Sequence, residues 1–366
     1  MAKMYEFFKH ESRGSLKVLY LYAEVMSYTL ATLRALADKD VELHVVHWDT
    51  RKLTPFEIGS IPGATFYPRS KMSLQHMQDL VRQISFNAVV VSGWVDKDYL
   101  SIARVLRRKN VAVVCGFDDQ WHGDTKQQLA AVLGGIRFFH RYFSHAWVAG
   151  APQYAYARRL GFDHREIIYD LYSADLNLFA EDYFRIHAEK ENSYPHKFLF
   201  VGRLHEVKGI MSLVSAWKTI RHECRDWGVC MIGNGPLRDK LNGVSEGIVC
   251  KDFVQPGLLP NEVAAAGCLV LPSRSEPWGV VLHEFAAAGL PIICSDVCGA
   301  ASAFVVDGWN GYTFRSLDAD ALAEKMLKII ETDDATLLEM GRRSHQLAGK
   351  ITPETSAANL LSVAHR

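Results

Sequence analysis

The stretch CLVLPSRSEPWGVVLHE, residues 268–284, contains a complete strand–turn–helix pattern. Its first four residues are apolar and typical of a short strand that is buried on both faces. A polar turn follows, and Gly279 then leads into an apolar helical stretch. The earlier segment FLFVGRLHEVKG, residues 198–209, has the same order of strand, glycine turn and helix start. We therefore expect a fold built from repeated βα units.

Short apolar segments alternate with helical stretches along the whole chain. We expect strands at residues 17–22, 42–48, 88–92, 111–116, 146–149, 197–202, 229–233, 247–251, 268–271 and 291–295. Helical stretches are expected at residues 29–38, 98–107, 210–222, 284–288 and 352–363. Repeated βα units form parallel sheets with helices on both faces, and ligands bind beyond the carboxyl ends of the strands. The fold class is therefore α/β, with two Rossmann-like doubly wound domains facing each other across a cleft.

The length of 366 residues suits two domains of ordinary size. We expect an N-terminal domain at residues 1–175 on the acceptor side of the cleft and a C-terminal domain at 176–345. A charged and irregular stretch, residues 175–196, joins them. Residues 346–366 end the chain as a helix that could pack back on the first domain.

Charge and composition exclude several classes of protein. Lys+Arg and Asp+Glu both count 41, so no basic excess attracts nucleic acid, and we expect no nucleic-acid partner. Residues 1–17 mix charges among apolar residues and lack the apolar core of a secretion signal. No apolar run approaches the roughly 18 residues that a membrane-spanning helix needs.

The seven cysteines form no CxxC pair, and their odd number is typical of reduced thiols. This pattern favours a cytoplasmic location. Cys294 and Cys298 lie four residues apart, but the sequence supplies no further ligands beside them, so we expect no metal site.

Two carboxylates bracket the predicted helix start after Gly279. The free N–H groups of a helix start attract phosphate. Glu276 precedes it and Glu284 follows, and eight helical steps between them would span about 12 Å. They would therefore contact two ends of one extended ligand that is anionic in its middle. The alternative is that Glu276 caps the helix electrostatically and Glu284 is a solvated surface acid.

Two cations follow the strand of residues 197–202. Arg203 leaves the strand end after Gly202, and Lys208 stands at the next helix start. The planar fork of an arginine and the compact charge of a lysine could together neutralise a diphosphate. The alternative is that both are ordinary surface cations.

These motifs, taken in order, resemble family 4 of the retaining glycosyltransferases, which have the GT-B fold. The segments that carry the resemblance are YSADLNLF (172–179), VGRL (201–204) with Lys208-Gly209, GNGPL (233–237), Glu-x7-Glu (276–284) and DGWNG (307–311). The similarity extends from Tyr172 to about Ile330, so it covers the second half of the chain.

The resemblance implies a metal-independent enzyme that transfers a sugar with retention, from a UDP- or GDP-linked donor to a hydroxyl acceptor, in glycan, polysaccharide or glycolipid synthesis. It implies that no cofactor is needed. In the family, the residues that correspond to Arg203 and Lys208 bind the diphosphate and stabilise it as it departs. Glu284 would hold the ribose and Glu276 the sugar. The donor would also contact the Gly202 turn, the backbone of Trp278, Gly279, Val280 and Val281, and, at the base, Phe253 and Val254.

The first half departs from the family pattern. The segment after the first strand, Tyr22–Tyr28, contains no glycine, and the family histidine has no clear counterpart. We expect Asp118, Asp119 and His122, after a later strand, to contact the acceptor or the donor sugar, with Glu24 as a further candidate. The alternative is a turn with helix-capping aspartates. Residues 298–303 also lack the second glycine and the glutamate that are usual there.

The basic and aromatic segment 136–143 has two interpretations. It could contact lipid headgroups near a lipid-linked acceptor, which would place the protein at the cytoplasmic face of a membrane. Alternatively, its aromatic rings face the core and its arginines are solvated. The acceptor itself could be a glycan, a lipid-linked sugar or a small molecule with a hydroxyl group.

Two other functions fit the same architecture. One is a sugar-nucleotide epimerase, which would bind a similar donor but need acid and base groups in the cleft. The other is a catalytically inactive sugar-nucleotide-binding partner, suggested by the departures in the first half. A dinucleotide dehydrogenase is disfavoured because no Gly-x-Gly-x-x-Gly follows a strand.

Overall fold

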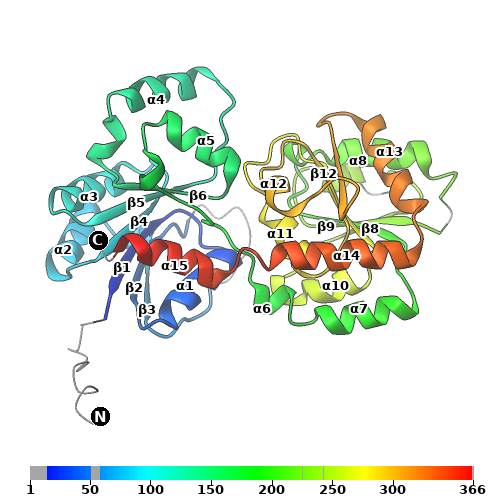
Figure 1. Cartoon of the computed structure of the whole chain (residues 1–366), viewed down its shortest axis with the longest axis horizontal. Coiled ribbons are helices and arrows are strands. Elements are labelled where there is room, and N and C mark those ends of the chain that lie inside the picture. The colour runs from blue at the N-terminus through cyan, green and yellow to red at the C-terminus, as the bar shows by residue number, and fades with distance from the viewer. Residues whose placement is uncertain (1–14, 51–57, 225, 242, 365–366) are drawn as a thin grey trace, which may run out of the picture.

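The computed structural model describes residues 15–50, 58–224, 226–241 and 243–364. Most of the N-terminal segment in which we expected no secretion signal lies outside them. Within the described residues, two parallel sheets lie side by side, one of seven strands and one of six (Figure 1). Their strand orders are β3-β2-β1-β4-β5-β6-β7 and β10-β9-β8-β11-β12-β13. Both are doubly wound, as predicted.

The elements of the first domain alternate between strands and helices, with short 3₁₀ helices named η. In chain order they are β1 (Lys17–Tyr22), α1 (Ser27–Ala37), β2 (Glu42–His47), β3 (Ala64–Pro68), η1 (Arg69–Lys71), α2 (Leu74–Gln83), β4 (Ala88–Ser92), α3 (Lys97–Arg108), β5 (Ala112–Phe117), α4 (Thr125–Gly135), η2 (Phe138–Arg141), β6 (His145–Val148), α5 (Ala151–Arg159), η3 (His164–Glu166) and β7 (Ile167–Ile168).

The remaining elements join the domains, build the second domain and return to the first. They are α6 (Leu176–Phe179), α7 (Tyr183–Asn192), β8 (Lys197–Val201), η4 (Glu206–Lys208), α8 (Ile210–Ile220), β9 (Gly228–Ile232), α9 (Arg238–Leu241), β10 (Ile248–Lys251), η5 (Pro256–Leu258), α10 (Leu259–Ala264), β11 (Cys268–Leu271), α11 (Val280–Ala287), β12 (Ile292–Ser295), α12 (Ala301–Phe304), β13 (Gly311–Phe314), α13 (Ala319–Ile330), α14 (Asp334–Ala348) and α15 (Pro353–Ala364).

The strand order reverses at equivalent places in the two sheets. β1 lies between β2 and β4, and β8 lies between β9 and β11. The loops after β8 and β11 therefore leave neighbouring strands at the switch point, where doubly wound sheets bind their ligands. These two loops carry the predicted cations and carboxylates.

The prediction for residues 175–196 was wrong in one respect. The stretch is not irregular, because it contains α6 and α7. Helix α7 buries only Tyr183, Ile186 and Lys190, and its other faces mix charged residues with the exposed Phe184. This narrow buried stripe, one of whose members is a lysine, hid the helical period in the sequence.

The chain passes between the domains twice, and one side chain contacts both crossings. His283 on α11 accepts a hydrogen bond at Nδ1 from the backbone N–H of Ala174 (2.9 Å). Its Nε2 donates to the carbonyl oxygen of Ala348 (3.0 Å). Burial lowers the pKa of His283 to about 4, so the ring stays neutral at physiological pH.

The last helix returns to the first domain. Helix α15 lies against α1 (Figure 1). The Ser356 hydroxyl donates to the carbonyl oxygen of Asp170 (2.6 Å), and the Asn359 amide donates to that of Tyr169 (3.1 Å). The domain boundaries proposed from the sequence stay predictions.

Lys190 is a buried cation in the second domain. Its side chain is 4% exposed, and Nζ donates to the carbonyl oxygen of Ala266 (2.7 Å). Burial lowers the pKa of Lys190 to about 7. An unfolded lysine has a pKa of about 10.4. Between about pH 7 and pH 10.4, position 190 therefore carries more bound proton in the unfolded chain than in the folded one. Deprotonation of Lys190 therefore stabilises the fold as the pH rises above about 7.

We expect the substitution Lys190→Met to remove this pH dependence. Between about pH 7 and pH 8.5, the unfolding free energy of the unsubstituted protein should rise relative to that of the variant by up to about 1.4 kcal/mol per pH unit. Urea unfolding of both proteins across this range measures the difference. Parallel stability curves would show that Lys190 is not deprotonated in the folded state.

Candidate functional site

A pocket of about 340 Å³ lies between the two domains, at the carboxyl ends of both sheets. Every residue predicted to bind the donor lines it: Gly202, Arg203, Lys208, Phe253, Val254, Glu276, Trp278, Gly279, Val280, Val281 and Glu284. The chain thus brings together segments that are up to about 80 residues apart in sequence. Of the four residues predicted for the acceptor side, Asp118 lines the pocket and Glu24, Asp119 and His122 do not.

The loops after β8 and β11 pack directly on each other. Gly209 has a left-handed backbone (φ 66°), and a Cβ at this position would collide with the carbonyl oxygen of Pro272. Only glycine fits both requirements. This close approach sets Lys208, the residue before Gly209, beside the loop that carries Glu276.

Glu276 is buried, and one of its two carboxylate oxygens accepts two hydrogen bonds. Its Oε2 accepts from Lys208 Nζ at 2.5 Å and from the Ser273 hydroxyl at 3.0 Å. Its side chain is 10% exposed and that of Lys208 18% exposed, so water screens this ion pair only weakly. Arg203 is exposed at the pocket, and none of the described residues forms an ion pair with it.

Helix α11 begins at the pocket after Gly279, which has φ 90° and provides no side-chain cap. Because glycine has no side chain, the N-cap residue offers no acceptor to the free N–H groups at the start of the helix. Electrostatic capping by Glu276 needs no such hydrogen bond, so that alternative stays open.

Glu284, one turn further along α11, also lines the pocket. Burial and the neighbouring charge of Asp175 raise its pKa to about 7. Glu284 is therefore not a solvated surface acid.

The first domain contributes aromatic groups in place of a glycine turn. Tyr28 and Tyr172 line the pocket and their rings contact each other, with centroids 4.9 Å apart. Neither was predicted to contact a ligand, although Tyr172 lies in a segment that carries the family resemblance. Met26, Ser27 and Asn234 also line the pocket and were not predicted.

Asp118 is the acidic group of the first domain at this site. Burial, together with the charge of Asp119, raises the pKa of Asp118 to about 6. Asp119 and His122 are exposed beside the pocket, and Asp124 caps α4 by accepting from the backbone N–H of Gln127 (2.9 Å). The helix-capping alternative thus holds for Asp124, and Asp118 alone fits a role in the cleft.

Two glutamines of the first domain hold the Glu276 loop. Gln120 Nε2 donates to the carbonyl oxygens of Glu276 (3.1 Å), Pro277 (2.9 Å) and Val297 (3.1 Å). Gln153, which is fully buried, donates to Pro277 (2.6 Å) and, within its own domain, to Asp118 (2.9 Å). We call Gln120 and Gln153 the glutamine clamp. It fixes the Glu276 loop against the first domain.

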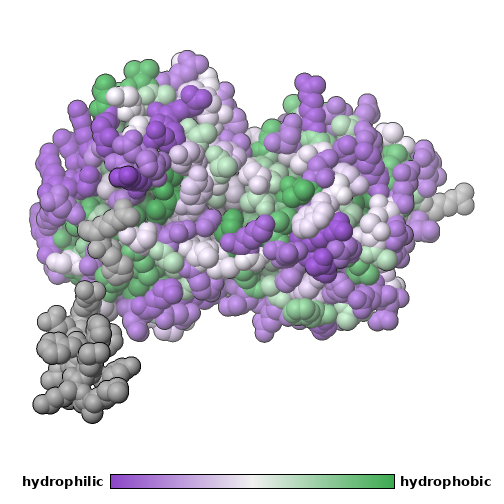
Figure 2. All heavy atoms as spheres, in the orientation of Figure 1, coloured by the Kyte–Doolittle hydropathy of each residue, from purple (hydrophilic) through white to green (hydrophobic). Residues whose placement is uncertain are grey.

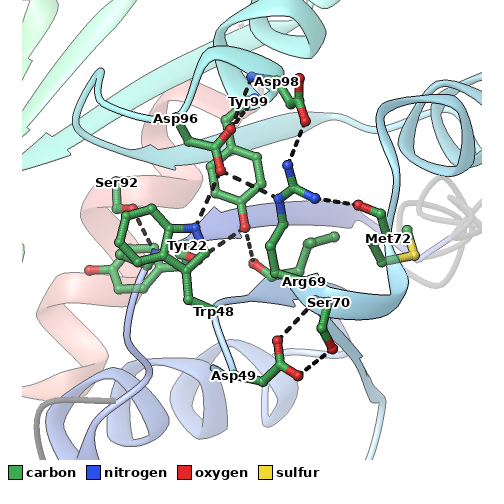
Figure 3. A network of polar contacts seen from close by, with 12 residues as sticks. Tyr22, Trp48, Asp49, Arg69, Ser70, Met72, Ser92, Asp96, Asp98 and Tyr99 are labelled. Atoms are coloured by element: carbon green, nitrogen blue, oxygen red, sulfur yellow. Dashed lines mark hydrogen bonds and ion pairs between the residues drawn. The ribbon is translucent and has the colours of Figure 1, made fainter. Parts of the chain in front are cut away.

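A second polar network orders the carboxyl edge of the first sheet (Figure 3). Arg69 donates to Asp96 (3.4 Å) and to Asp98 (2.5 Å), and the Trp48 indole also donates to Asp96 (3.3 Å). The Tyr99 hydroxyl donates to the carbonyl oxygen of Tyr22 (3.2 Å). The network ties together the loops after β1, β2, β3 and β4.

Trp278 forms the apolar contact between the domains at the pocket. It is 1% exposed, and a Cβ on Gly150 of the first domain would lie 2.5 Å from its ring. Gly150 has an extended backbone (φ −174°), so an alanine there would be disfavoured by collision alone.

We therefore expect Gly150→Ala to lower the unfolding free energy by about 1–3 kcal/mol, because the Trp278 ring or the domain contact must shift. Gly135→Ala is the control: nothing lies within 4 Å of its Cβ, and a helical glycine-to-alanine change should stabilise by about 0.4–1 kcal/mol. Chemical unfolding measures whether the unfolding free energy falls in Gly150→Ala and rises in Gly135→Ala. Equal stability of Gly150→Ala and the unsubstituted protein would contradict the close contact.

Comparison with known proteins adds a family match for one domain. Residues 195–332 match the family model described as glycosyl transferases group 1. An uncharacterized glycosyltransferase of Methanocaldococcus jannaschii is 38% identical over 109 residues, which are 28% of this chain and 27% of that protein. The chain spans less than half the length of the first curated relatives that it matches.

Solved structures match the whole architecture. The sucrose-phosphate synthase of Thermosynechococcus elongatus aligns with a TM-score of 0.71 at 18% identity, over 96% of this chain and 97% of that one. Anabaena HepE in complex with UDP-glucose aligns with a TM-score of 0.68 at 16% identity, over 95% and 98%. The chain therefore has the GT-B fold, and the predicted donor-binding residues all lie within the segment that is similar to glycosyl transferases group 1.

Proposed function

We propose that this protein is a retaining, metal-independent glycosyltransferase that moves a sugar from a nucleoside diphosphate sugar to a hydroxyl acceptor. The observation that carries the proposal is the single pocket in which Arg203, Lys208, Glu276, Glu284 and the start of α11 meet. This arrangement offers the cations Arg203 and Lys208 and free N–H groups together with the carboxyl groups of Glu276, which contacts Lys208, and Glu284. It complements an extended ligand that is anionic in its middle.

In this proposal the diphosphate lies between Arg203, Lys208 and the start of α11. The bond between the anomeric carbon and the β-phosphate oxygen breaks, and the acceptor oxygen bonds to the same face of the anomeric carbon. The acceptor proton passes to the departing phosphate. Negative charge grows on that phosphate, so cations and N–H groups already in place lower the barrier.

The two glutamates would hold the ends of the donor. Glu284 lies one turn into α11, where its carboxyl group could accept from or donate to ribose hydroxyls, because a pKa of about 7 leaves both forms populated near neutral pH. Glu276 is fixed by Lys208, Ser273 and the backbone contacts of the glutamine clamp. A carboxylate held this firmly suits recognition of sugar hydroxyls.

The wider setting of the reaction is also a proposal. A UDP-linked donor is supported by HepE, a structural neighbour in complex with UDP-glucose. The acceptor would be a glycan, a lipid-linked sugar or a small molecule, in glycan, polysaccharide or glycolipid synthesis. All seven cysteines lie in the described residues as free thiols, which supports a reducing, cytoplasmic location. No helix within the described residues has the length and apolar character to span a bilayer.

Incubation with a panel of UDP- and GDP-sugars, with and without candidate acceptors, tests the activity. We expect nucleoside diphosphate release that depends on an acceptor. The variant Arg203→Ala should lower kcat by on the order of 10²–10³-fold. Arg274→Ala is a matched control, because Arg274 is exposed in the Glu276 loop but does not line the pocket. Sugar isomerisation without release would instead indicate an epimerase, and binding without turnover an inactive partner.

Asp118 should set a pH dependence of transfer. Its carboxyl group has a pKa of about 6 and could orient the acceptor hydroxyl only when ionised. We expect the transfer rate to rise through about pH 6 and this limb to disappear in Asp118→Asn. Asp119→Asn, at the exposed neighbouring position, should keep the limb but move it to lower pH, because the charge of Asp119 helps to raise the pKa of Asp118. Rate profiles of the three proteins measure the effect, and an unchanged limb in Asp118→Asn would remove Asp118 from the mechanism.

A further inference from the structure

Helix α4 of the first domain covers the core with one face and exposes apolar residues on another. Its fully buried positions are Gln127 and Gly134, and Ala130 and Leu133 pack partly against the core. The exposed apolar side chains are Leu129 (62% exposed), Val132 (70%) and the adjoining Ile136 (70%). Their spacings of three and four residues place them on one face of the helix.

The orientation of α4 is fixed by specific contacts. Gln127 Oε1 accepts from the backbone N–H groups of His122 (2.7 Å) and Gly123 (3.0 Å), and Nε2 donates to the carbonyl oxygen of Gln120 (2.6 Å). At the other end, a Cβ on Gly134 would lie 2.5 Å from the backbone of Leu160, so the two backbones touch. Rolling the helix to bury its apolar face would break both contacts.

A cationic hollow lies beside this helix. It has a volume of about 320 Å³ and lies between the end of α3 and η2, which packs on α4. Its lining residues are Arg104, Arg107, Arg108, His140 and Arg141. Among the described residues, none forms an ion pair with these four arginines. The nearby acid Glu166 pairs instead with Arg137 and His140 (both 3.0 Å).

The aromatic residues of the segment that follows α4 do not extend the exposed face. Phe139 and Phe143 are buried in the core of the first domain. Ile136 and Arg141 remain outside. The interpretation that the aromatic rings face the core thus holds for Phe139 and Phe143. Ile136 continues the exposed apolar face of α4, and Arg141 lines the cationic hollow.

We propose that Leu129, Val132 and Ile136, together with the hollow formed by Arg104, Arg107, Arg108 and Arg141, dock on an anionic lipid bilayer. We call these residues the α4 surface. Apolar side chains on one helix face insert at the boundary between headgroups and acyl chains. Arginines beside them attract lipid phosphates and anionic headgroups. Figure 2 shows hydrophobic residues exposed at the edge of the first domain where Figure 1 places α4.

A bilayer fits this surface better than a second copy of the chain. In a twofold dimer the same patch meets itself, so the unpaired arginines would face each other. A neutral protein partner would leave the same four charges without counterions. The proposal does not depend on the proposed glycosyltransferase activity, since it uses no residue of the pocket between the domains.

The test is sedimentation of the full chain with vesicles of phosphatidylcholine, with and without phosphatidylglycerol. We expect binding only when phosphatidylglycerol is present, weakened by salt. The double variant Leu129→Asp/Val132→Asp and the double variant Arg104→Glu/Arg108→Glu should each lower vesicle binding at least about tenfold.

Two control variants match these changes in chemistry. Val249→Asp alters an apolar residue of the second domain that is 58% exposed, and Lys218→Glu reverses an exposed cation in the last turn of α8, as Arg108 is in that of α3. Both should bind vesicles like the unsubstituted protein. Thermal unfolding and binding of nucleoside diphosphate check that all variants fold.

Three outcomes would overturn the proposal. The first is no binding to phosphatidylglycerol vesicles, and the second is binding that both double variants retain. The third is a dimer in solution that Leu129→Asp/Val132→Asp dissociates, because the α4 surface would then join two copies of the chain. A protein that binds vesicles but transfers no sugar would leave the docking surface intact and refute only the proposed activity.

Discussion

The candidate site depends on the contact between the loops after β8 and β11. Gly209 has no side chain where the carbonyl oxygen of Pro272 lies, so the two loops can approach to backbone distance. That approach puts the ammonium group of Lys208 on the carboxylate of Glu276. Any side chain at position 209 would separate them, and the positive centre of the pocket would lose its alignment with the start of α11. The absence of a side chain at position 209 thus sets the geometry of this part of the pocket.

Many of the buried strands, and the residues of the second domain that line the pocket, could be predicted because their signals are local. β1, β4 and β11 have the predicted bounds, since each is a short apolar run bounded by polar residues or glycine. The strands that were missed, β3, β7 and β13, all lie at sheet edges and are only partly buried. In β3 and β13 a threonine interrupts the apolar pattern, and β7 is only two residues long.

The contribution of the first domain to the site was harder to predict because it is made by distant contacts. The glutamine clamp joins residues that are 124 to 177 positions apart in sequence. Nothing in the neighbourhood of Gln120 or Gln153 indicates that their amides meet the backbone of another domain. Asp118 was found because it follows a strand, whereas Tyr28 and Tyr172 contribute rings whose positions depend on how the domains face each other.

The His283 imidazole affects how the two domains are held together. The two segments that pass between the domains hydrogen-bond to this one ring, through Ala174 and Ala348. The glutamine clamp joins the domains elsewhere, at the Glu276 loop. Separating the domains at that loop must break the four amide hydrogen bonds that run from the clamp to the second domain. The bonds at His283 are a separate set, made where the chain passes between the domains. The two domains are therefore held together at two places, by the ring at the chain crossings and by the two glutamines at the Glu276 loop.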